Sequence, residues 1–343
     1  MQTGAGVLTI NSPTNIAVAN QTGTIGGVNG ASLSGTLALQ VASGAATSRT
    51  MTLSDSAADI DLLVTAKITD GDGNANLQSL VVQPPASTLN GGRVELRPTV
   101  ASDFTGTLTV AANVGAGGTS TLRVRAGNAG ALGASGATAG TIVSGGTLEL
   151  SSLTVVDEPL SLSGVNGFAD RGGVVGLTGA NVAWQQSTVA NLVALTGDAR
   201  IGVESGGTLD FNAQIAQSGG SRGFTKVLGG DLRLSGSSAN TFAGTTNVWE
   251  GRLRLAKSAG VDALAGGQLN IGVGNDTGDS ADRDALIEEA GEQINPSVTV
   301  QIGPSGVWDL GGFTESIGNT TNATALTIQP GLALRPTVMN GTL

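Results

Sequence analysis

The sequence predicts an all-β protein, a β-solenoid in which short parallel strands stack coil upon coil in a single elongated rod. Three observations predict this fold. Sequence segments recur at a fixed offset, apolar and polar residues alternate along short runs, and the chain combines 55 glycines with only 3% aromatic residues. A short strand cannot bury its apolar face alone, so a repeated strand gains stability by stacking on its neighbours.

The internal repeat is clearest in two pairs of segments. Residues 91–96 (GGRVEL) match 229–234 (GGDLRL), and residues 104–107 (FTGT) match 242–245 (FAGT). Both pairs are separated by the same offset along the chain, because 229 − 91 equals 242 − 104. A fixed period of this kind is typical of stacked or arrayed architectures. Because the repeated element is a short strand after a glycine pair, the sequence predicts an array of strands.

Apolar and polar residues alternate in short runs along the chain, as in 107–110 (TLTV), 147–150 (TLEL) and 252–255 (RLRL). A period of two places the apolar side chains on one face of a strand. Gly, Asn, Asp or Ser residues bound these runs, as expected at turns. The long repeat and the scarcity of aromatic residues favour parallel stacking over antiparallel hairpins. We expect about 20–25 residues per coil.

We expect one continuous solenoid segment over 1–343, with its clearest repeat copies at 91–150 and 207–271 and an acidic loop insertion at 275–295. Local helix propensity over 281–290 leaves two alternatives inside that insertion, a single helical turn or a loop that leads into a strand. Strand patterning reaches both ends of the chain, so we expect a segment of a longer array.

The composition argues against several classes of function. Lys and Arg number 16 against 26 Asp and Glu, and the basic residues are scattered. Nucleic-acid binding is not expected, because phosphate neutralisation needs clustered cations. The chain has no Cys and no His, so it lacks thiolate and imidazole ligands and cannot form a Ser-His-Asp triad. No run approaches the ~18–20 apolar residues of a membrane helix, so we expect no membrane span.

Calcium is the one cofactor that the sequence leaves open. Asp70, Asp72 and Asn74 place oxygen ligands at alternate positions, as at the start of a calcium loop. The bidentate Glu expected at position 12 of such a loop is replaced by Val81, and a turn between coils is the alternative. A denser acidic loop around Asp276 and Asp279 is a second candidate, with a solvated loop as its alternative.

A polysaccharide lyase or hydrolase is an alternative to a structural role. Asp198 with Arg200, or Asp210 with basic residues on adjacent coils, could form the carboxylate and cation groups of such a site. Glycoside hydrolysis needs carboxylates about 5–10 Å apart. Isolated Asp-x-Arg pairs more often form cross-strand surface pairs. Three tryptophans are candidates either for a carbohydrate-stacking surface or for covering coil corners: Trp184, Trp249 and Trp308.

Residues 239–255 (ANTFAGTTNVWEGRLRL) form the most specific stretch of the repeat, preceded by 206–211 (GGTLDF) and 225–236 (TKVLGGDLRLSG). Together with a looser copy over 91–150, they resemble the autotransporter-associated β-strand repeat of bacterial surface and secreted proteins. The resemblance is strongest over 145–265. It implies a right-handed parallel β-helix with a passenger or stalk role outside the cell.

The repeat also predicts which residues face the core and which form corners. We expect five apolar residues to be inward positions of consecutive strands: Leu232, Leu234, Val248, Leu253 and Leu255. Three glycines are expected at corners with positive φ: Gly236, Gly244 and Gly251. Asn240 is expected at a corner, where its side chain would bond backbone groups and stack with Asn of the next coil.

We therefore expect a non-enzymatic, extracellular or cell-surface β-solenoid that acts as a stalk, spacer or adhesin segment of a larger bacterial protein. Its expected partners are neighbouring repeats, other copies of itself, or a host or matrix polysaccharide. Two alternatives stay open at this point: a self-assembling filament or matrix subunit, and the polysaccharide lyase or hydrolase.

Overall fold

The structure, a computed structural model, forms two compact units, Met1–Val174 and Val175–Leu343, each with its own core. We describe each unit by itself. The structure describes the following residues: 2–9, 16–18, 30–39, 47–56, 58–71, 77–85, 91–111, 121–136, 139–164, 167–188, 192–273, 284–320, 324–330 and 336–343.

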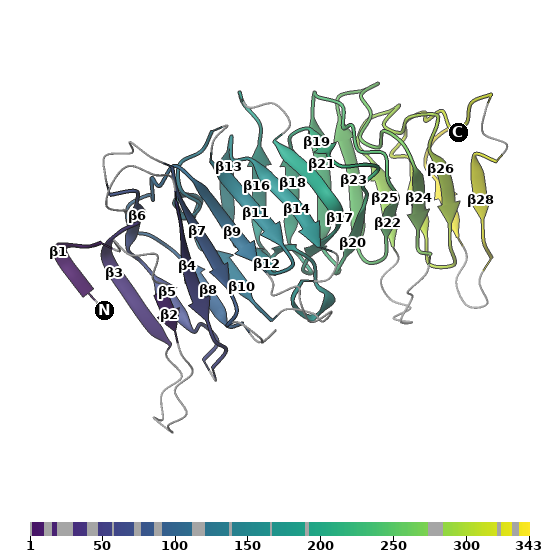
Figure 1. Cartoon of the computed structure of the whole chain (residues 1–343). Coiled ribbons are helices and arrows are strands. Elements are labelled where there is room, and N and C mark those ends of the chain that lie inside the picture. The colour runs from purple at the N-terminus through teal and green to yellow at the C-terminus, as the bar shows by residue number, and fades with distance from the viewer. Residues whose placement is uncertain are drawn as a thin grey trace. The chain divides into compact units, whose positions relative to one another are not determined.

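The strands of the first unit fall mainly into two series, and the chain passes repeatedly from one series to the other (Figure 1). Strands pair within their own series. The first series contains β1 (Gln2–Thr9), β3 (Ala31–Ala38), β5 (Leu62–Val64), β6 (Lys67–Thr69), β8 (Arg93–Leu96), β10 (Arg123–Ala126) and β12 (Thr147–Leu150). The second contains β2 (Ile16–Val18), β4 (Thr47–Leu53), β7 (Gln78–Gln83), β9 (Thr107–Ala111), β11 (Gly140–Ser144) and β14 (Leu160–Gly164). The unit also includes β13 (Leu153–Val156) and the 3-10 helices η2 (Ala129–Ala131) and η3 (Phe168–Asp170).

The second unit follows the same plan, after β15 (Val174–Gly176) at the boundary. One series contains β16 (Asn181–Gln185), β18 (Thr208–Asn212), β21 (Asp231–Gly236), β23 (Arg252–Lys257), β25 (Ala285–Glu288), β27 (Val307–Asp309) and β29 (Thr337–Met339). The other contains β17 (Val193–Val203), β19 (Ile215–Gln217), β20 (Phe224–Val227), β22 (Thr246–Val248), β24 (Gln268–Ile271), β26 (Thr299–Ile302) and β28 (Leu326–Ile328).

Within each unit, the pairings between these described strands are all parallel, which confirms the predicted all-β class and parallel strands. We call the stretch of chain from one strand to the strand paired with it a coil, and the pairing register measures its length. Thr208 pairs with Asp231 and Asp231 pairs with Arg252, so these two coils match the expected length of about 20–25 residues. Other coils are longer than expected, since Arg252 pairs with Ala285 on the next coil.

This longer coil contains the first part of the predicted acidic insertion, up to residue 284. Its residues 274–283 lie outside the described part of the chain. The stretch then enters strand β25 at Ala285, so the alternative of a loop leading into a strand is the correct one.

No helix within the described residues is long and apolar enough to cross a membrane.

The core consists of apolar side chains that stack in register between coils. Leu253 pairs with Leu232 on one side and Leu286 on the other, and none of the three is exposed to solvent. This column shows how a strand buries its apolar face: the next coil covers it. The structure confirms all five predicted core residues as fully buried: Leu232, Leu234, Val248, Leu253 and Leu255.

Glycine is required at the corners for two different reasons. Gly236 (φ 99°) and Gly251 (φ 68°) adopt the predicted left-handed conformation, which favours glycine. The prediction for Gly244 is wrong, since this residue does not have a positive φ. A Cβ atom at Gly244 would collide with the carbonyl carbon of Arg222, so close approach of two backbones excludes a side chain there.

Asn240 is buried at a corner, and its side chain bonds backbone groups of two other coils. Its Oδ1 accepts a hydrogen bond from the Ile215 amide (2.8 Å), and its Nδ2 donates to the Ala263 carbonyl (2.8 Å). The predicted bonding to the backbone is therefore confirmed. A buried side chain that satisfies one donor and one acceptor fixes the corner geometry of consecutive coils.

We expect Leu253→Ala to destabilise the second unit by about 2–5 kcal/mol, because it leaves a cavity in a column that the neighbouring coils cannot collapse. Urea unfolding followed by circular dichroism measures the change. The control is Leu343→Ala, whose side chain is 48% exposed and which should cost well under about 1 kcal/mol. Equal shifts in the two variants would contradict the core assignment.

Candidate functional site

The first unit gathers charged residues on three consecutive strands, β8, β10 and β12. Their apolar residues stack toward the core, with Val94, Val124 and Leu148 in register and fully buried. The alternate positions point to the opposite face of the strands, because side chains alternate along a strand. Those positions place Glu95, Arg125 and Glu149 in register across the three strands. At these positions the register aligns charges of opposite sign, whereas Arg123 aligns with Arg93.

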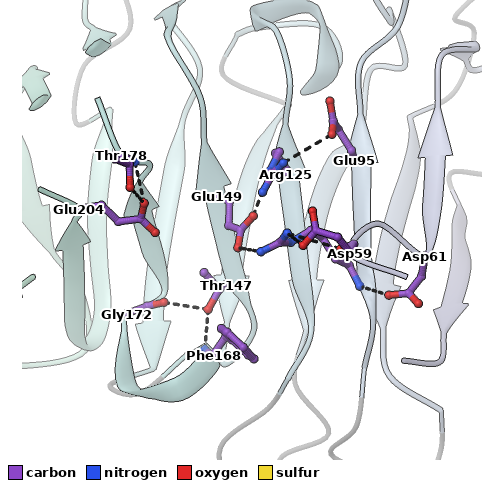
Figure 2. Close-up of polar contacts among 11 residues, drawn as sticks. Asp59, Asp61, Glu95, Arg125, Thr147, Glu149, Phe168, Gly172, Thr178 and Glu204 are labelled. Atoms are coloured by element: carbon purple, nitrogen blue, oxygen red, sulfur yellow. Dashed lines mark hydrogen bonds and ion pairs between the residues drawn. The ribbon is translucent and has the colours of Figure 1, made fainter. Parts of the chain in front are cut away.

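These charges form a buried ion cluster, defined by Arg93, Glu95, Arg125 and Glu149, with the exposed Asp59 at its edge. Figure 2 shows Arg125 between the two glutamates. Arg93 Nη2 lies 3.1 Å from Glu149 Oε1, and Arg125 Nε donates to Glu149 Oε2 at 3.1 Å. Arg125 Nη1 lies 3.7 Å from Glu95 Oε2, and Arg93 also pairs with Asp59. The Glu149 side chain is 1% exposed, so its partners replace nearly all of its hydration.

Neighbouring groups hold this cluster in place. Asp61, itself buried, accepts from the backbone amides of Arg93 (2.7 Å) and Ser56 (2.8 Å). The Arg123 guanidinium stacks over the Phe168 ring, 4.2 Å from its centroid. Burial lowers the pKa of Arg123, and the nearby Arg93 charge lowers it further.

The chemistry of the buried ion cluster is that of ion pairing. Each Glu149 oxygen forms an ion pair with an arginine, Arg93 or Arg125. Glu95 forms ion pairs with Arg97 and Arg125. A carboxylate that acts as a general acid or base needs an oxygen free to exchange a proton with a substrate. In this cluster, both Glu149 oxygens and Glu95 Oε2 pair with arginines of other strands, and Glu95 Oε1 pairs with Arg97, two residues further along the chain. The arrangement supports cohesion between coils.

The second unit carries a more exposed network of ion pairs, which we call the outer charge ladder. Arg233 donates to Asp210 (2.8 Å) and Glu289 (2.9 Å). Arg254 donates to Asp231 (2.8 Å) and Glu289 (3.3 Å). The outer charge ladder has three arginines and three acids: Asp210, Asp231, Arg233, Arg252, Arg254 and Glu289. It links strands β18, β21 and β23 with the turn after β25.

The residues proposed for a lyase or hydrolase have structural partners. Asp198 Oδ1 accepts from the Gly223 amide (3.1 Å), and the Arg200 guanidinium stacks on Trp249, 5.2 Å from the ring centroid. Asp210 accepts from Ser235 and from Arg233 within the outer charge ladder. Each of these contacts joins one coil to another, as the cross-strand alternative predicted.

Of the first calcium candidate, Asp70, Asp72 and Asn74, only Asp70 lies within the described residues. Its carboxylate is fully buried and accepts from the Thr105 amide (3.0 Å) and hydroxyl (2.7 Å). Asp276 and Asp279, the second candidate, lie outside the described residues. Where the structure is described, no group of three acidic side chains is placed to hold a metal ion.

The tryptophans differ in their exposure. Trp184 and Trp308 are fully buried, and Trp308 Nε1 donates to Glu288 Oε1 (2.8 Å). Trp249 is half-buried beneath Arg200. A carbohydrate-stacking platform needs exposed ring faces, so Trp184 and Trp308 cannot contribute to one. Both side chains fill the interior of the second unit, which is a structural role.

Several ionisable groups are buried inside the units. Burial raises the pKa of Glu158 to about 8, while its bond from the Thr141 hydroxyl (2.8 Å) opposes the shift. Burial lowers the pKa of Lys226 to about 7, although its ammonium donates to the carbonyls of Val227 and Glu250 (both 2.9 Å). Such groups couple the stability of a unit to pH.

A buried pair of carboxyls adds to this coupling in the second unit. Burial raises the pKa of both Glu288 and Glu315, and the charge of Glu315 raises the pKa of Glu288 further. Glu315 also accepts from the amides of Gln293 (2.7 Å) and Ile294 (3.1 Å), which opposes the rise in its own pKa. Two buried carboxyls in contact favour a state in which one keeps its proton.

The main members of the buried ion cluster were not predicted from the sequence as site residues. A signal exists in the charged residues at alternate positions of three short runs, 93–95 (RVE), 123–125 (RVR) and 147–149 (TLE). Comparison of the chain with protein-family models, with curated proteins and with solved structures gives no match.

We expect Glu149→Gln to destabilise the first unit by about 3 kcal/mol, because it leaves the buried Arg93 guanidinium short of a counter-charge. Asp59→Asn is the matched control. It removes another partner of the same arginine, but the Asp59 side chain is 76% exposed, so the expected cost is at most about 1 kcal/mol. Urea unfolding measures both. A larger loss in Asp59→Asn would contradict the importance of the buried pairs.

Glu158 should make the first unit less stable as pH rises. Its folded pKa of about 8 lies above the ordinary value of 4.5, so the folded state binds more protons between these two values. The stabilising contribution is therefore complete below about pH 4.5 and is lost as pH rises through about 8. We expect Glu158→Gln to flatten this dependence in urea unfolding. Asp103→Asn, on a side chain 44% exposed, should leave the dependence intact; a slope unchanged in Glu158→Gln would refute the assignment.

Proposed function

We propose that this chain is a right-handed parallel β-solenoid that serves as a non-enzymatic spacer segment of a bacterial surface or secreted protein. The observation that carries the proposal is the register of the strands. In each unit, the chain passes repeatedly between two series, and the strands of a series pair with an earlier member one or two strands back. Coiling is the simplest path with that pattern. Its hand follows from the strong preference of parallel strands for right-handed crossover connections.

The spacer role is supported by how the coils hold together. Backbone hydrogen bonds, the apolar column through Leu253 and the side chain of Asn240 each connect consecutive coils. The buried ion cluster and the outer charge ladder connect further coils on the outer faces of strands. The stability of such an array is a sum over the interfaces between neighbouring coils. This suits a segment that must span a distance and resist pulling.

The location outside the cell is part of the proposal and rests on the resemblance to the autotransporter-associated β-strand repeat. Residues 239–255 carry that resemblance, and they make the corner of Asn240, strand β22 and the start of strand β23. The absence of Cys agrees with export through a narrow pore. A filament subunit and a polysaccharide lyase or hydrolase are the competing functions, and the experiment below separates them.

The test is negative-stain electron microscopy of the purified chain over a range of concentrations, combined with incubation on a panel of neutral and acidic polysaccharides. The spacer proposal predicts separate short rods at every concentration and no release of sugar products. Fibres that lengthen with concentration would replace it with the filament function. Release of oligosaccharides would replace it with the enzyme, and compact round particles would refute the solenoid itself.

A further inference from the structure

The turns that follow strands β16, β18 and β21 form a polar cavity of about 160 Å³ in the second unit. Two amides and three hydroxyls line it, with the backbone of Gly236. The amides belong to Gln186 and Asn212, and the hydroxyls to Ser187, Ser237 and Ser238. The three serines are exposed, so the cavity opens to solvent. Three consecutive coils thus each place hydrogen-bonding side chains at one spot.

The walls of this cavity are held by hydrogen bonds between coils. The Gln186 backbone amide donates to the Asn212 carbonyl (2.8 Å), and Gln186 Oε1 accepts from the Gln214 backbone amide (2.9 Å). Below the turn, the buried Lys257 ammonium donates to the Ala213 carbonyl (2.7 Å). Groups fixed in this way lose little freedom when a ligand binds, which favours affinity.

Gly236 keeps the Asn212 amide accessible. Its φ of 99° is left-handed, and a Cβ atom at this position would lie 2.9 Å from Asn212 Oδ1. Any larger residue would therefore crowd the polar atom that the turn presents. The glycine at this corner therefore both allows the chain to turn and leaves space beside the Asn212 amide.

The lining residues are uncharged and rich in hydrogen-bonding groups. None of the described residues that line the cavity is charged, and their amide and hydroxyl groups can each donate and accept hydrogen bonds. Asp210 and Arg233 of the outer charge ladder, on the strands that lead into these turns, neutralise each other. At about 30 Å³ per water, the cavity holds about five waters, which a compact group with several hydroxyls could replace.

We propose that this cavity binds one saccharide unit of an uncharged glycan. The proposal goes beyond the spacer role and does not depend on it, since the cavity needs only three coils of the second unit. It gives the segment a polysaccharide partner and assigns recognition to Gln186, Asn212 and the serines around them.

The test is a titration of the isotope-labelled full chain with chitohexaose, maltohexaose and hexagalacturonate, followed by amide NMR shifts. We expect at least one of the two neutral oligosaccharides to shift amides of 186–187, 212–213 and 236–238, and the anionic one to bind more weakly. A double variant, Ser237→Val combined with Ser238→Val, removes both hydroxyls and should weaken binding about tenfold or more. Ser221→Val, at an exposed turn outside the cavity, is the matched control and should bind normally.

Circular dichroism melting of each variant shows whether it is folded, and exposed serine positions should tolerate valine. Absence of shifts with both neutral oligosaccharides would overturn the proposal. Shifts that persist unchanged in the double serine variant would overturn it equally, as would tighter binding of hexagalacturonate. Separate rods in electron microscopy with none of these shifts would keep the spacer and reject the saccharide site.

Discussion

Parallel pairing of each strand with the strand one coil earlier is the constraint on which the rest of the structure depends. A short strand has too little apolar surface to be stable alone, and its stability comes from the coils on either side. The pairing register therefore determines which side chains of neighbouring coils lie next to each other. When Leu232, Leu253 and Leu286 align, the residues between them align as well, on the opposite face of each strand. One apolar column thus fixes the position of every charge beside it.

This constraint explains how a chain with few charges uses them. Only 12% of the residues are charged, yet they concentrate in networks that cross several coils. Aligned positions on neighbouring strands would repel if they carried the same sign. In the first unit Glu95, Arg125 and Glu149 alternate in sign along the stack. Removal of one partner from such a buried pair is costly, because it leaves an uncompensated charge away from water.

The local features of the fold could be predicted from the sequence, because they depend on neighbouring residues. Alternation identified the buried Leu253 and Leu255, and the repeat identified Gly236 and Gly251 as left-handed corners. The same pattern predicts a left-handed corner at Gly244, but glycine is required there because the backbone of another coil lies too close for a side chain. The sequence pattern alone cannot distinguish a local conformational need from a distant steric one.

The site was harder to predict because it depends on coil length. Arg93 and Glu149 meet although they lie far apart in the sequence, and that partnership spans two coils of unequal length. Coils of one uniform length would have paired different side chains. The polar cavity is equally hidden, since Gln186, Asn212 and Ser237 come from three turns whose alignment follows only from the register.

The most direct measurement of the in-register stacking is disulfide trapping in this chain, which has no cysteine of its own. Asn247 and Asn270 are register partners on β22 and β24, and their side chains share a hydrogen bond of 2.8 Å. Substituted as Asn247→Cys and Asn270→Cys, they should crosslink under mild oxidation, because partners in adjacent strands fall within disulfide reach. Asn247→Cys with Gln268→Cys, a pair shifted out of register, should not. Crosslinking of the shifted pair in preference to the aligned pair would contradict the parallel register and the proposed solenoid.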